Sequence, residues 1–327
     1  MSVPAVVARA QDDRPVALVL RALGLGDLLV SVPALRALRR ARPEHRVVLA
    51  APAWLGPVVD LVDAVDTLLP VAGLDEPLPE VGGGPPDLAV NLHGRGPQSH
   101  ARLDALAPRH RVGHAAPGWD GPAWVEEVGE RLRWLDLLRH HGLARDADDP
   151  DDPAALGLRR PSVPSPAPGA VVVHVGAAYG SRSWPAERFA AVARTLTAAG
   201  HRVVLTGSAA EQERAGAIAV AAGLPQGADL AGRTGLAELA ALVADAALVV
   251  TVDTGAAHLA TAYGTPSVVL FGPAPVARWG PPPGGPHVVL TDERVRRGDV
   301  FAPEPDPALL AVTVDDVLGA AERLLRA

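Results

Sequence analysis

The chain of 327 residues contains no cysteine and no lysine, and aromatic residues make up only 3% of it. The absence of cysteine excludes a disulfide framework, a thiolate metal site and a cysteine nucleophile. No uninterrupted apolar run reaches the roughly 18 residues that a membrane-spanning helix needs, so we expect no transmembrane segment. The N-terminus also lacks the charged and apolar regions of a signal peptide, and the cytoplasm is therefore the expected location.

The charge balance is acidic, with 37 acidic and 30 basic residues and a formal net charge of −7 at pH 7. This balance disfavours non-specific binding to nucleic acid, so we expect no nucleic-acid partner. All the basic residues are arginine, so a site that commonly uses lysine must use arginine here. The arginine-rich residues 36–46 are expected to cover the end of a helix, and peripheral contact with an anionic acceptor or a membrane surface is a weaker alternative.

Short apolar runs alternate with amphipathic stretches along the chain, which is the pattern of βα units in parallel sheets. At about 150 residues per domain, the length predicts two domains. Buried strands are expected at residues 16–20, 46–50, 87–92, 171–175, 201–206, 248–252 and 267–271. Helices are expected at residues 27–41, 124–141, 185–199, 208–222, 236–244, 257–263 and 314–325.

Two segments near the middle of the chain interrupt this periodicity. An acidic run occupies residues 145–152, and the proline-rich stretch GLRRPSVPSPAPG occupies residues 157–169. Such a stretch joins neither a helix nor a sheet, so we expect an interdomain linker at 157–168. The prediction is an α/β fold with one Rossmann-like domain at 1–156 and a second at 169–327. Two doubly wound halves should bind ligands in the cleft between them, at the carboxyl ends of strands.

The first chemical motif, RALGLGDLLVSVP at residues 21–33, joins the end of a strand to the start of a helix. Gly24 and Gly26 allow a tight turn, and Asp27 stands where the helix opens. Its carboxylate could take a proton from an acceptor hydroxyl group, or it could only cap the helix. Leu29 occupies the third glycine position of a dinucleotide-binding fingerprint, which disfavours an NAD-dependent dehydrogenase.

Two further motifs follow strands of the second half. In HVGAAYGSRSWPAERF, residues 174–189, backbone N–H groups near Gly176 could hold phosphate oxygens, with Arg182 adding a fixed charge. The alternative is an ordinary loop with a solvated arginine. In TGSAAEQER, residues 206–214, Glu211 could accept hydrogen bonds from ribose hydroxyl groups, or it could form a capping box with Ser208.

The most informative motif is LVVTVDTGAAHL at residues 248–259. An apolar strand ends in a short turn of Asp253, Thr254 and Gly255, and a helix of small residues follows. Free N–H groups and the helix dipole suit a diphosphate there, and His258 would lie at the same point. Alone, His258 would more often be a partly buried structural histidine. Neither the histidines between residues 93 and 141 nor the acidic run has the spacing of a metal site, so no metal is expected.

Taken in this order, the motifs resemble those of the heptosyltransferase family, glycosyltransferase family nine, which has the GT-B fold. The matching segments are LGLGDLLVSVPALRALR at 23–39, HVGAAYGSRSWPAERFAAVARTL at 174–196, VVLTGSAAEQERA at 203–215, residues 229–273, and WGP at 279–281. The DTG-x-x-H segment with its flanks is the most specific of them. Residues 54–145 match only loosely, around DLAVNLHGR.

The resemblance implies an inverting, metal-independent transfer of a sugar, usually heptose from ADP-heptose, to a hydroxyl group of a saccharide acceptor, with no cofactor. It implies that Asp27 is the acidic base. It places donor binding on Gly176, Arg182, Glu211, Asp253, Thr254, Gly255 and His258, and acceptor binding on Asn91, His93 and Arg95. Arg182 replaces the usual lysine on the diphosphate. Ala177 and Ala178 replace small hydroxyl residues of some members.

Three alternatives stay open at this point. The same chemistry could act on a soluble small-molecule or natural-product acceptor instead of the lipopolysaccharide core. The chain could also be a GT-B-type sugar-nucleotide epimerase or hydrolase, or a non-catalytic sugar-nucleotide-binding protein. In GT-B proteins the last helix often crosses back to the first domain, so the helix at about 314–325 has two candidate packing partners.

Overall fold

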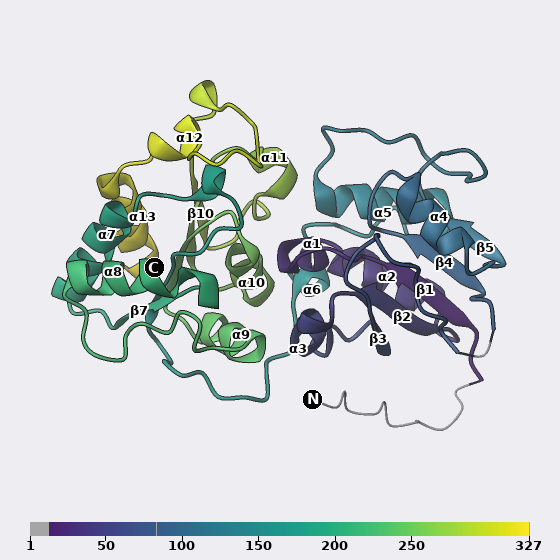
Figure 1. Cartoon of the computed structure of the whole chain (residues 1–327), viewed down its shortest axis with the longest axis horizontal. Helices are drawn as coiled ribbons and strands as arrows, with labels where there is room; N and C mark the ends of the chain where they lie inside the picture. The colour runs from purple at the N-terminus through teal and green to yellow at the C-terminus, as the bar shows by residue number, and fades with distance from the viewer. Residues whose placement is uncertain (1–12, 83, 327) are drawn as a thin grey trace.

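Two five-stranded parallel sheets organise the chain into two lobes, which lie side by side in the computed structural model (Figure 1). The structure describes residues 13–82 and 84–326. Strands β1–β5 precede residues 157–168 and strands β6–β10 follow them, and residues 157–168 themselves contain no helix or strand. The predicted α/β class with two doubly wound halves is confirmed.

The sheet of the first lobe has the strand order β3-β2-β1-β4-β5. Its strands are β1 (Val16–Leu20), β2 (Arg46–Ala51), β3 (Thr67–Pro70), β4 (Leu88–Asn91) and β5 (His110–Val112). Its helical segments are α1 (Leu25–Val30), α2 (Val32–Ala41), η1 (Ala53–Leu55), α3 (Gly56–Val59), α4 (Gln98–Asp104), α5 (Glu130–His140) and α6 (Pro153–Leu156). Leu20 pairs with Asn91, so the segments that follow β1 and β4 begin next to each other.

The sheet of the second lobe has the order β10-β9-β8-β6-β7. Its strands are β6 (Val171–His174), β7 (Val203–Thr206), β8 (Leu248–Val252), β9 (Ser267–Leu270) and β10 (His287–Leu290). Its helical segments are η2 (Gly180–Arg182), α7 (Ala186–Ala198), η3 (Ala209–Glu211), α8 (Gln212–Ala222), α9 (Leu236–Ala244), α10 (Gly255–Tyr263), α11 (Val276–Trp279), η4 (Glu293–Val295), α12 (Pro307–Leu310) and α13 (Val314–Arg326). His174 pairs with Thr251, so the segments after β6 and β8 also begin together.

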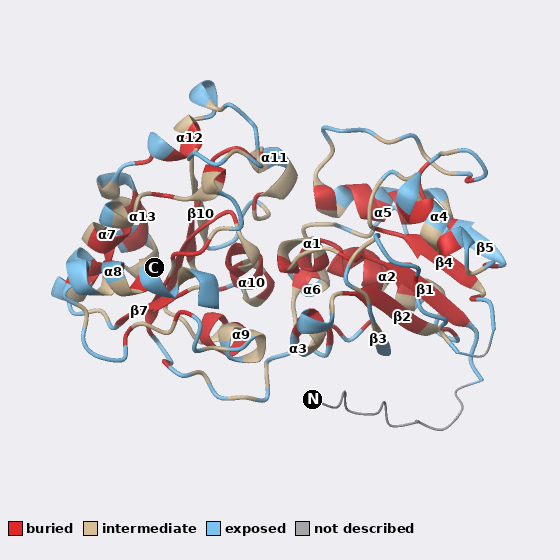
Figure 2. Ribbon diagram, viewed as in Figure 1, coloured by how far each residue is buried: buried red, intermediate tan, exposed pale blue. Residues whose placement is uncertain are grey.

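The central strands are continuous apolar runs because helices cover both faces of each sheet. In Figure 2 the strands β1 and β4 are coloured as buried along their length, and β2 is buried from Val47 onward. Strand order reverses between β1 and β4 and between β8 and β6. These are the topological switch points, where open α/β sheets bind their ligands.

The two lobes touch through α1 and α10, and through α3 and α9. The contact between α1 and α10 is close, because a Cβ atom on Gly255 would lie 2.7 Å from the side chain of Leu25. A Cβ atom on Gly26 would likewise lie 2.7 Å from Cδ2 of His258. Glycine is therefore required on both helices for this approach of the lobes.

Two predicted helices of the first lobe differ from the observed ones. The helix expected at 27–41 is two helices that meet at Ser31, because Pro33 has no N–H group to continue the hydrogen-bond ladder. The helix expected at 124–141 begins only at Glu130. Residues 125–128 instead fold around Arg133, whose guanidinium donates to the carbonyl oxygens of Val125, Glu126 and Val128.

Three edge strands and the short helices α3, α4, α6, α11 and α12 were not predicted, and the C-terminal helix takes one of its two expected positions. The sequence did not predict β3, β5 and β10, which are short, lie at sheet edges and are only partly buried. Helix α13 packs on the second sheet and on α7, with Val317, Ala320 and Ala321 in the core of that lobe, so it does not cross back to the first lobe. Among the described residues, no helix combines the length and apolar character needed to span a membrane.

Candidate active site

The switch points of the two sheets face each other across the contact between α1 and α10 (Figure 1). Asp27 lies on α1 of the first lobe, and Asp253 follows β8 of the second. A Cβ atom on Gly26, the residue before Asp27, would lie 2.7 Å from the His258 ring. Burial raises the pKa of Asp253, and the charge of Asp27 adds to this shift. The structure therefore brings together residues of both lobes that the sequence singled out separately.

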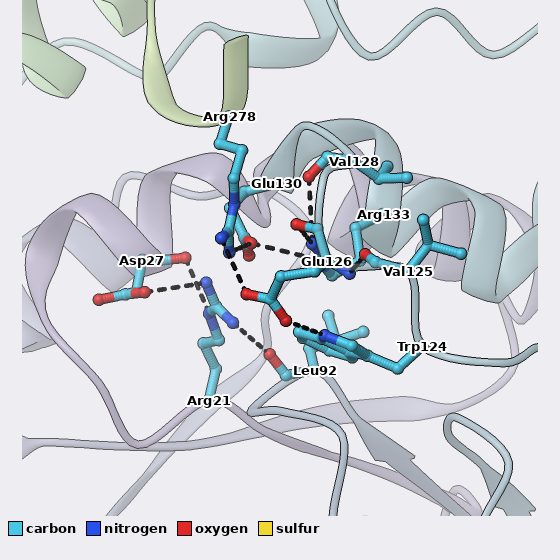
Figure 3. A network of polar contacts seen from close by, with 10 residues as sticks. All are labelled: Arg21, Asp27, Leu92, Trp124, Val125, Glu126, Val128, Glu130, Arg133 and Arg278. Carbon is cyan, nitrogen blue, oxygen red and sulfur yellow. Dashed lines mark hydrogen bonds and ion pairs between the residues drawn. The ribbon is translucent and has the colours of Figure 1, made fainter. Parts of the chain in front are cut away.

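Arg21 and the turn before α1 hold Asp27. Its Oδ1 lies 3.1 Å from Nη2 of Arg21, and its Oδ2 accepts the Gly24 N–H at 3.3 Å. Nε of Arg21 also donates to the main-chain oxygen of Asp27 at 2.9 Å (Figure 3). The Asp27 side chain remains 28% exposed. It therefore stabilises its own turn, as a capping residue does, and still presents a carboxylate to a ligand.

Arg182 and Asp253 form an ion pair on the opposite side. Nη1 of Arg182 lies 3.3 Å from Oδ2 of Asp253 and donates to its carbonyl oxygen at 3.2 Å. Burial raises the pKa of Asp253, Arg182 opposes this shift, and the charge of Asp27 adds to it. Nε of Arg182 is buried and has no hydrogen-bond partner among the described residues. The ion pair thus fixes a guanidinium that still has donors to offer.

His258 is buried on α10 between charged groups of both lobes. Its Nε2 lies 3.9 Å from Oδ1 of Asp253, which is too far for a hydrogen bond. Burial and the charge of Arg131 lower the pKa of His258 to about 4, although Asp27 opposes them. The ring is therefore neutral at pH 7 and can serve as a polar ligand but not as a cation.

Helix α10 begins at Gly255, and Thr254 is its N-cap residue. The side chain of Thr254 makes no capping hydrogen bond. Oγ1 of Thr254 instead lies 3.1 Å from Oγ1 of Thr251. The first N–H groups of a helix have no partner within the helix, and they carry the positive end of its dipole. This end, at Gly255, lies beside the guanidinium that Asp253 holds, so two sources of positive potential converge.

Glu211 is engaged with two backbone N–H groups. Its Oε1 accepts from Ala177 at 3.0 Å, and its Oε2 accepts from Ser208 as a capping box predicts. A Cβ atom on Gly176 would lie 2.7 Å from Oε2 of Glu211, which explains the glycine there. Glu211 therefore joins the loops that follow β6 and β7, and its role in binding ribose stays a prediction.

The three residues proposed for acceptor binding differ in their surroundings. Asn91 is fully buried and orders the loop after β4, with bonds to the carbonyl oxygen of Gly94, to Ser99 and from the N–H of His93. His93 follows Leu92, whose carbonyl oxygen accepts a hydrogen bond from Arg21, so it lies near the Arg21–Asp27 pair. Burial and the charge of Arg21 lower the pKa of His93 to about 4, and Asp27 opposes them. Arg95 is exposed. Any effect of Asn91 on an acceptor is therefore indirect.

A network of buried charges beside Asp27 was missed by the sequence reading (Figure 3). It contains Arg21, which is 1% exposed and lies over the ring of Trp134 at 4.7 Å from the centroid. It also contains Glu130 and Arg133 of α5 and Arg278 of α11. The available signal was an arginine directly after a buried strand, at position 21.

No group of three or more histidine, aspartate or glutamate residues within 13–82 and 84–326 is arranged to hold a metal ion. The expectation that the reaction needs no metal stays a prediction. Arg182 and the N-terminus of α10 supply positive charge on the side of the second lobe.

Comparison with known proteins places this site in context. The profile of glycosyltransferase family 9 (heptosyltransferase) matches residues 140–294. Lipopolysaccharide heptosyltransferase 1 of Pseudomonas aeruginosa is 38% identical over 155 residues, which are 46% of this chain and 41% of that protein. Lipopolysaccharide heptosyltransferase 2 of Escherichia coli K12 is 27% identical over 296 residues, covering 76% of this chain and 80% of the relative. The structure of E. coli ADP-heptose lipopolysaccharide heptosyltransferase II matches 95% of this chain and 98% of its own, with a TM-score of 0.74 and 21% identity. The predicted GT-B fold is confirmed.

Proposed function

We propose that the chain is a member of glycosyltransferase family 9 (heptosyltransferase), and that it transfers a heptose from ADP-heptose, with inversion, to a hydroxyl group of a saccharide acceptor. The observation that supports the proposal most directly is the packing of α1, which carries Asp27, against α10, at whose N-terminus Asp253 pairs with Arg182. A glycosyl transfer needs a proton acceptor on one side of the sugar and positive charge on the other.

The first lobe supplies the proton acceptor. The acceptor hydroxyl oxygen forms a bond to the anomeric carbon of the donor while its proton passes to the carboxylate of Asp27. The bond from the anomeric carbon to the diphosphate oxygen breaks in the same displacement. The first lobe carries the base, and the second lobe binds the diphosphate that leaves. The acceptor therefore attacks from the face opposite the departing diphosphate, and the anomeric configuration inverts.

The second lobe stabilises the charge of the leaving diphosphate. Arg182 offers guanidinium donors on a side chain that is 25% exposed, and α10 offers its first N–H groups. These groups are held in place before the reaction, so they act on the developing charge without reorganisation. Neutral His258 adds a hydrogen-bonding group without adding charge. We expect no metal requirement, and activity retained in excess EDTA would support this.

Glu211 binds the ribose in this proposal. A carboxylate has about four lone-pair sites, and the two backbone N–H groups that it now accepts leave room for a ribose hydroxyl group. The capping role and the ribose role are therefore compatible.

Calorimetric titration with ADP, UDP, GDP and TDP tests the donor. We expect ADP to bind most tightly, and equal affinity for all four would contradict the ADP-heptose assignment. Release of ADP from ADP-heptose is then measured with and without a deacylated lipopolysaccharide core saccharide. Release that needs the saccharide supports transfer, release without it supports a hydrolase, and binding without any turnover supports a non-catalytic protein.

A soluble small-molecule acceptor is the second candidate. The acidic chain, with a net charge of −7, favours it over an anionic lipid surface. The same assay with an aminocyclitol or another small polyol in place of the core saccharide distinguishes the two acceptors. With either acceptor, a nucleotide-sugar donor agrees with the cytoplasmic location expected from the sequence.

A further inference from the structure

A row of charges of alternating sign runs from Asp27 in the first lobe to Arg278 in the second (Figure 3). Oδ1 of Asp27 lies 3.1 Å from Nη2 of Arg21. Burial lowers the pKa of Arg21, the charges of Asp27 and Glu130 oppose this shift, and the charge of Arg133 adds to it. Oε1 of Glu130 accepts hydrogen bonds from Nε of Arg133 and from Nη2 of Arg278, each at 3.1 Å. The carboxylate of the site is thus linked through charged groups to the opposite lobe.

Arg278 is the second lobe's contribution to this row. It lies on α11, whereas the other residues drawn in Figure 3 belong to the first lobe. Nη1 of Arg278 also donates to Oε1 of Glu126 at 2.9 Å, and Nε1 of Trp124 donates to the other oxygen of Glu126 at 2.7 Å. The Glu130 side chain is only 5% exposed and that of Arg278 21%, so their pair is largely shielded from water. These contacts form only while the two lobes touch.

Arg21 cannot shift without affecting Asp27. It donates to the carboxylate and to the main-chain oxygen of Asp27, and to the carbonyl oxygen of Leu92. Its guanidinium also lies over the ring of Trp134. Because Arg21 is buried, water cannot replace a partner that it loses.

Loss of Arg278 changes the charge balance at Arg21. Glu130 would keep Arg133 but lose one of its two cationic partners, which leaves excess negative charge in a buried place. That charge attracts the Arg21 guanidinium away from Asp27, and burial weakens the solvent screening of this attraction. Contact with Arg278 restores the balance and leaves Arg21 to pair with Asp27.

We propose that Arg278 is a positioning residue for the transfer reaction, which neutralises Glu130 across the lobe contact and thereby holds Arg21 against Asp27. The carboxylate is then aimed at the acceptor hydroxyl group only when the lobes are together. This inference rests on the proposed function of Asp27 as the general base.

The test compares Arg278→Gln, which removes the charge, with Arg278→Lys, which keeps it. Arg294→Gln is the matched control, because Arg294 is an arginine of the same lobe whose side chain is 87% exposed and pairs with Asp292. Rates with ADP-heptose and a deacylated lipopolysaccharide core saccharide give kcat and KM, and calorimetry gives the affinity for ADP. We expect kcat of Arg278→Gln to fall about tenfold, on the scale of a small misplacement of a reacting group. Its ADP affinity should stay within about twofold, Arg278→Lys should recover most of the rate, and Arg294→Gln should match the unaltered protein.

The decisive measurement is a double-mutant cycle with Asp27→Asn. If Arg278 acts through Asp27, Arg278→Gln changes kcat by less than about twofold in the Asp27→Asn background. An equal loss in both backgrounds would overturn the inference and leave the role of Asp27 intact. Near-normal turnover of Asp27→Asn alone would overturn the proposed function, and the inference with it. A loss of ADP affinity in Arg278→Gln as large as the loss in kcat would also overturn the inference, because it would assign Arg278 to donor binding.

Discussion

Replacing Arg182 with alanine tests the donor half of the site most directly. The guanidinium pairs with Asp253 at 3.3 Å and keeps a buried Nε without a protein partner. We propose that the accessible part of this guanidinium, on a side chain that is 25% exposed, meets the diphosphate. A hydrogen bond to a charged group contributes about 1.5–3 kcal/mol, so its loss should weaken ADP binding roughly 10- to 150-fold.

The surroundings of Asp253 place the expected loss in the upper part of this range. Its side chain is 5% exposed, and without Arg182 its charge would lack its nearest cation. A buried unpaired carboxylate beside the diphosphate repels it, in addition to the lost hydrogen bond. Neutralising that carboxylate should therefore restore part of the affinity, so the double variant Arg182→Ala with Asp253→Asn should bind ADP more tightly than Arg182→Ala alone.

Calorimetric titration with ADP measures both effects, with Arg294→Ala as the control for loss of an exposed arginine. Arg182→Lys should recover much of the affinity, because a point charge can still face both Asp253 and the diphosphate. An ADP affinity of Arg182→Ala within about twofold of the unaltered protein would refute the assignment, and the N-terminus of α10 would then have to hold the diphosphate alone. Failure of Asp253→Asn to restore any affinity would refute the explanation by an unpaired carboxylate.

Three further outcomes are expected. Asp27→Asn keeps the cap of α1 but removes the proton acceptor, so kcat should fall roughly 10²–10⁴-fold while calorimetry shows nearly unchanged ADP binding; near-normal turnover would reduce Asp27 to a cap. Gly255→Ala places a Cβ atom 2.7 Å from Leu25, so it should lower the free energy of unfolding by about 1–3 kcal/mol, and with it Tm, and should also lower turnover. Leu25→Ala in the same chain should relieve both effects, and failure to do so would mean that the clash is not their cause. The free energy of unfolding should fall as the pH is lowered from about 7 to about 5, because burial lowers the pKa of His93, His114, His174, His258 and His287 to about 4. Between about pH 6.5 and 4 the unfolded chain binds more protons than the folded chain, so lowering the pH favours unfolding. Denaturant titrations that show constant stability over this window would contradict the argument.

The order of strands and helices was largely predictable because buried parallel strands are continuous apolar runs bounded by turns. The strands β1, β2, β4, β6, β7, β8 and β9 all lie where such runs occur. The edge strands β3, β5 and β10 escaped this signal because they are half-exposed and short. Residues 124–129 were wrongly predicted to be helical for another reason. Their side chains follow a helical pattern, but the guanidinium of Arg133 binds their carbonyl oxygens in a non-helical conformation.

The sequence by itself determined which residues stand at the carboxyl ends of strands, since each motif follows an apolar run. It therefore singled out Asp27, Arg182, Glu211 and the turn at Asp253 without knowledge of their contacts. Only the tertiary structure decided which of them meet: the glycines at 26 and 255 let the lobes approach, and Asp27 comes within electrostatic reach of Asp253 and His258. It also turned Asn91 inward and buried Arg21, Glu130 and Arg133, which a sequence reading treats as surface residues. The pattern of apolar residues along a strand or helix indicates which of its residues are buried. Pairing between distant charges depends instead on how separate strands and helices pack, and this packing exists only in the folded chain.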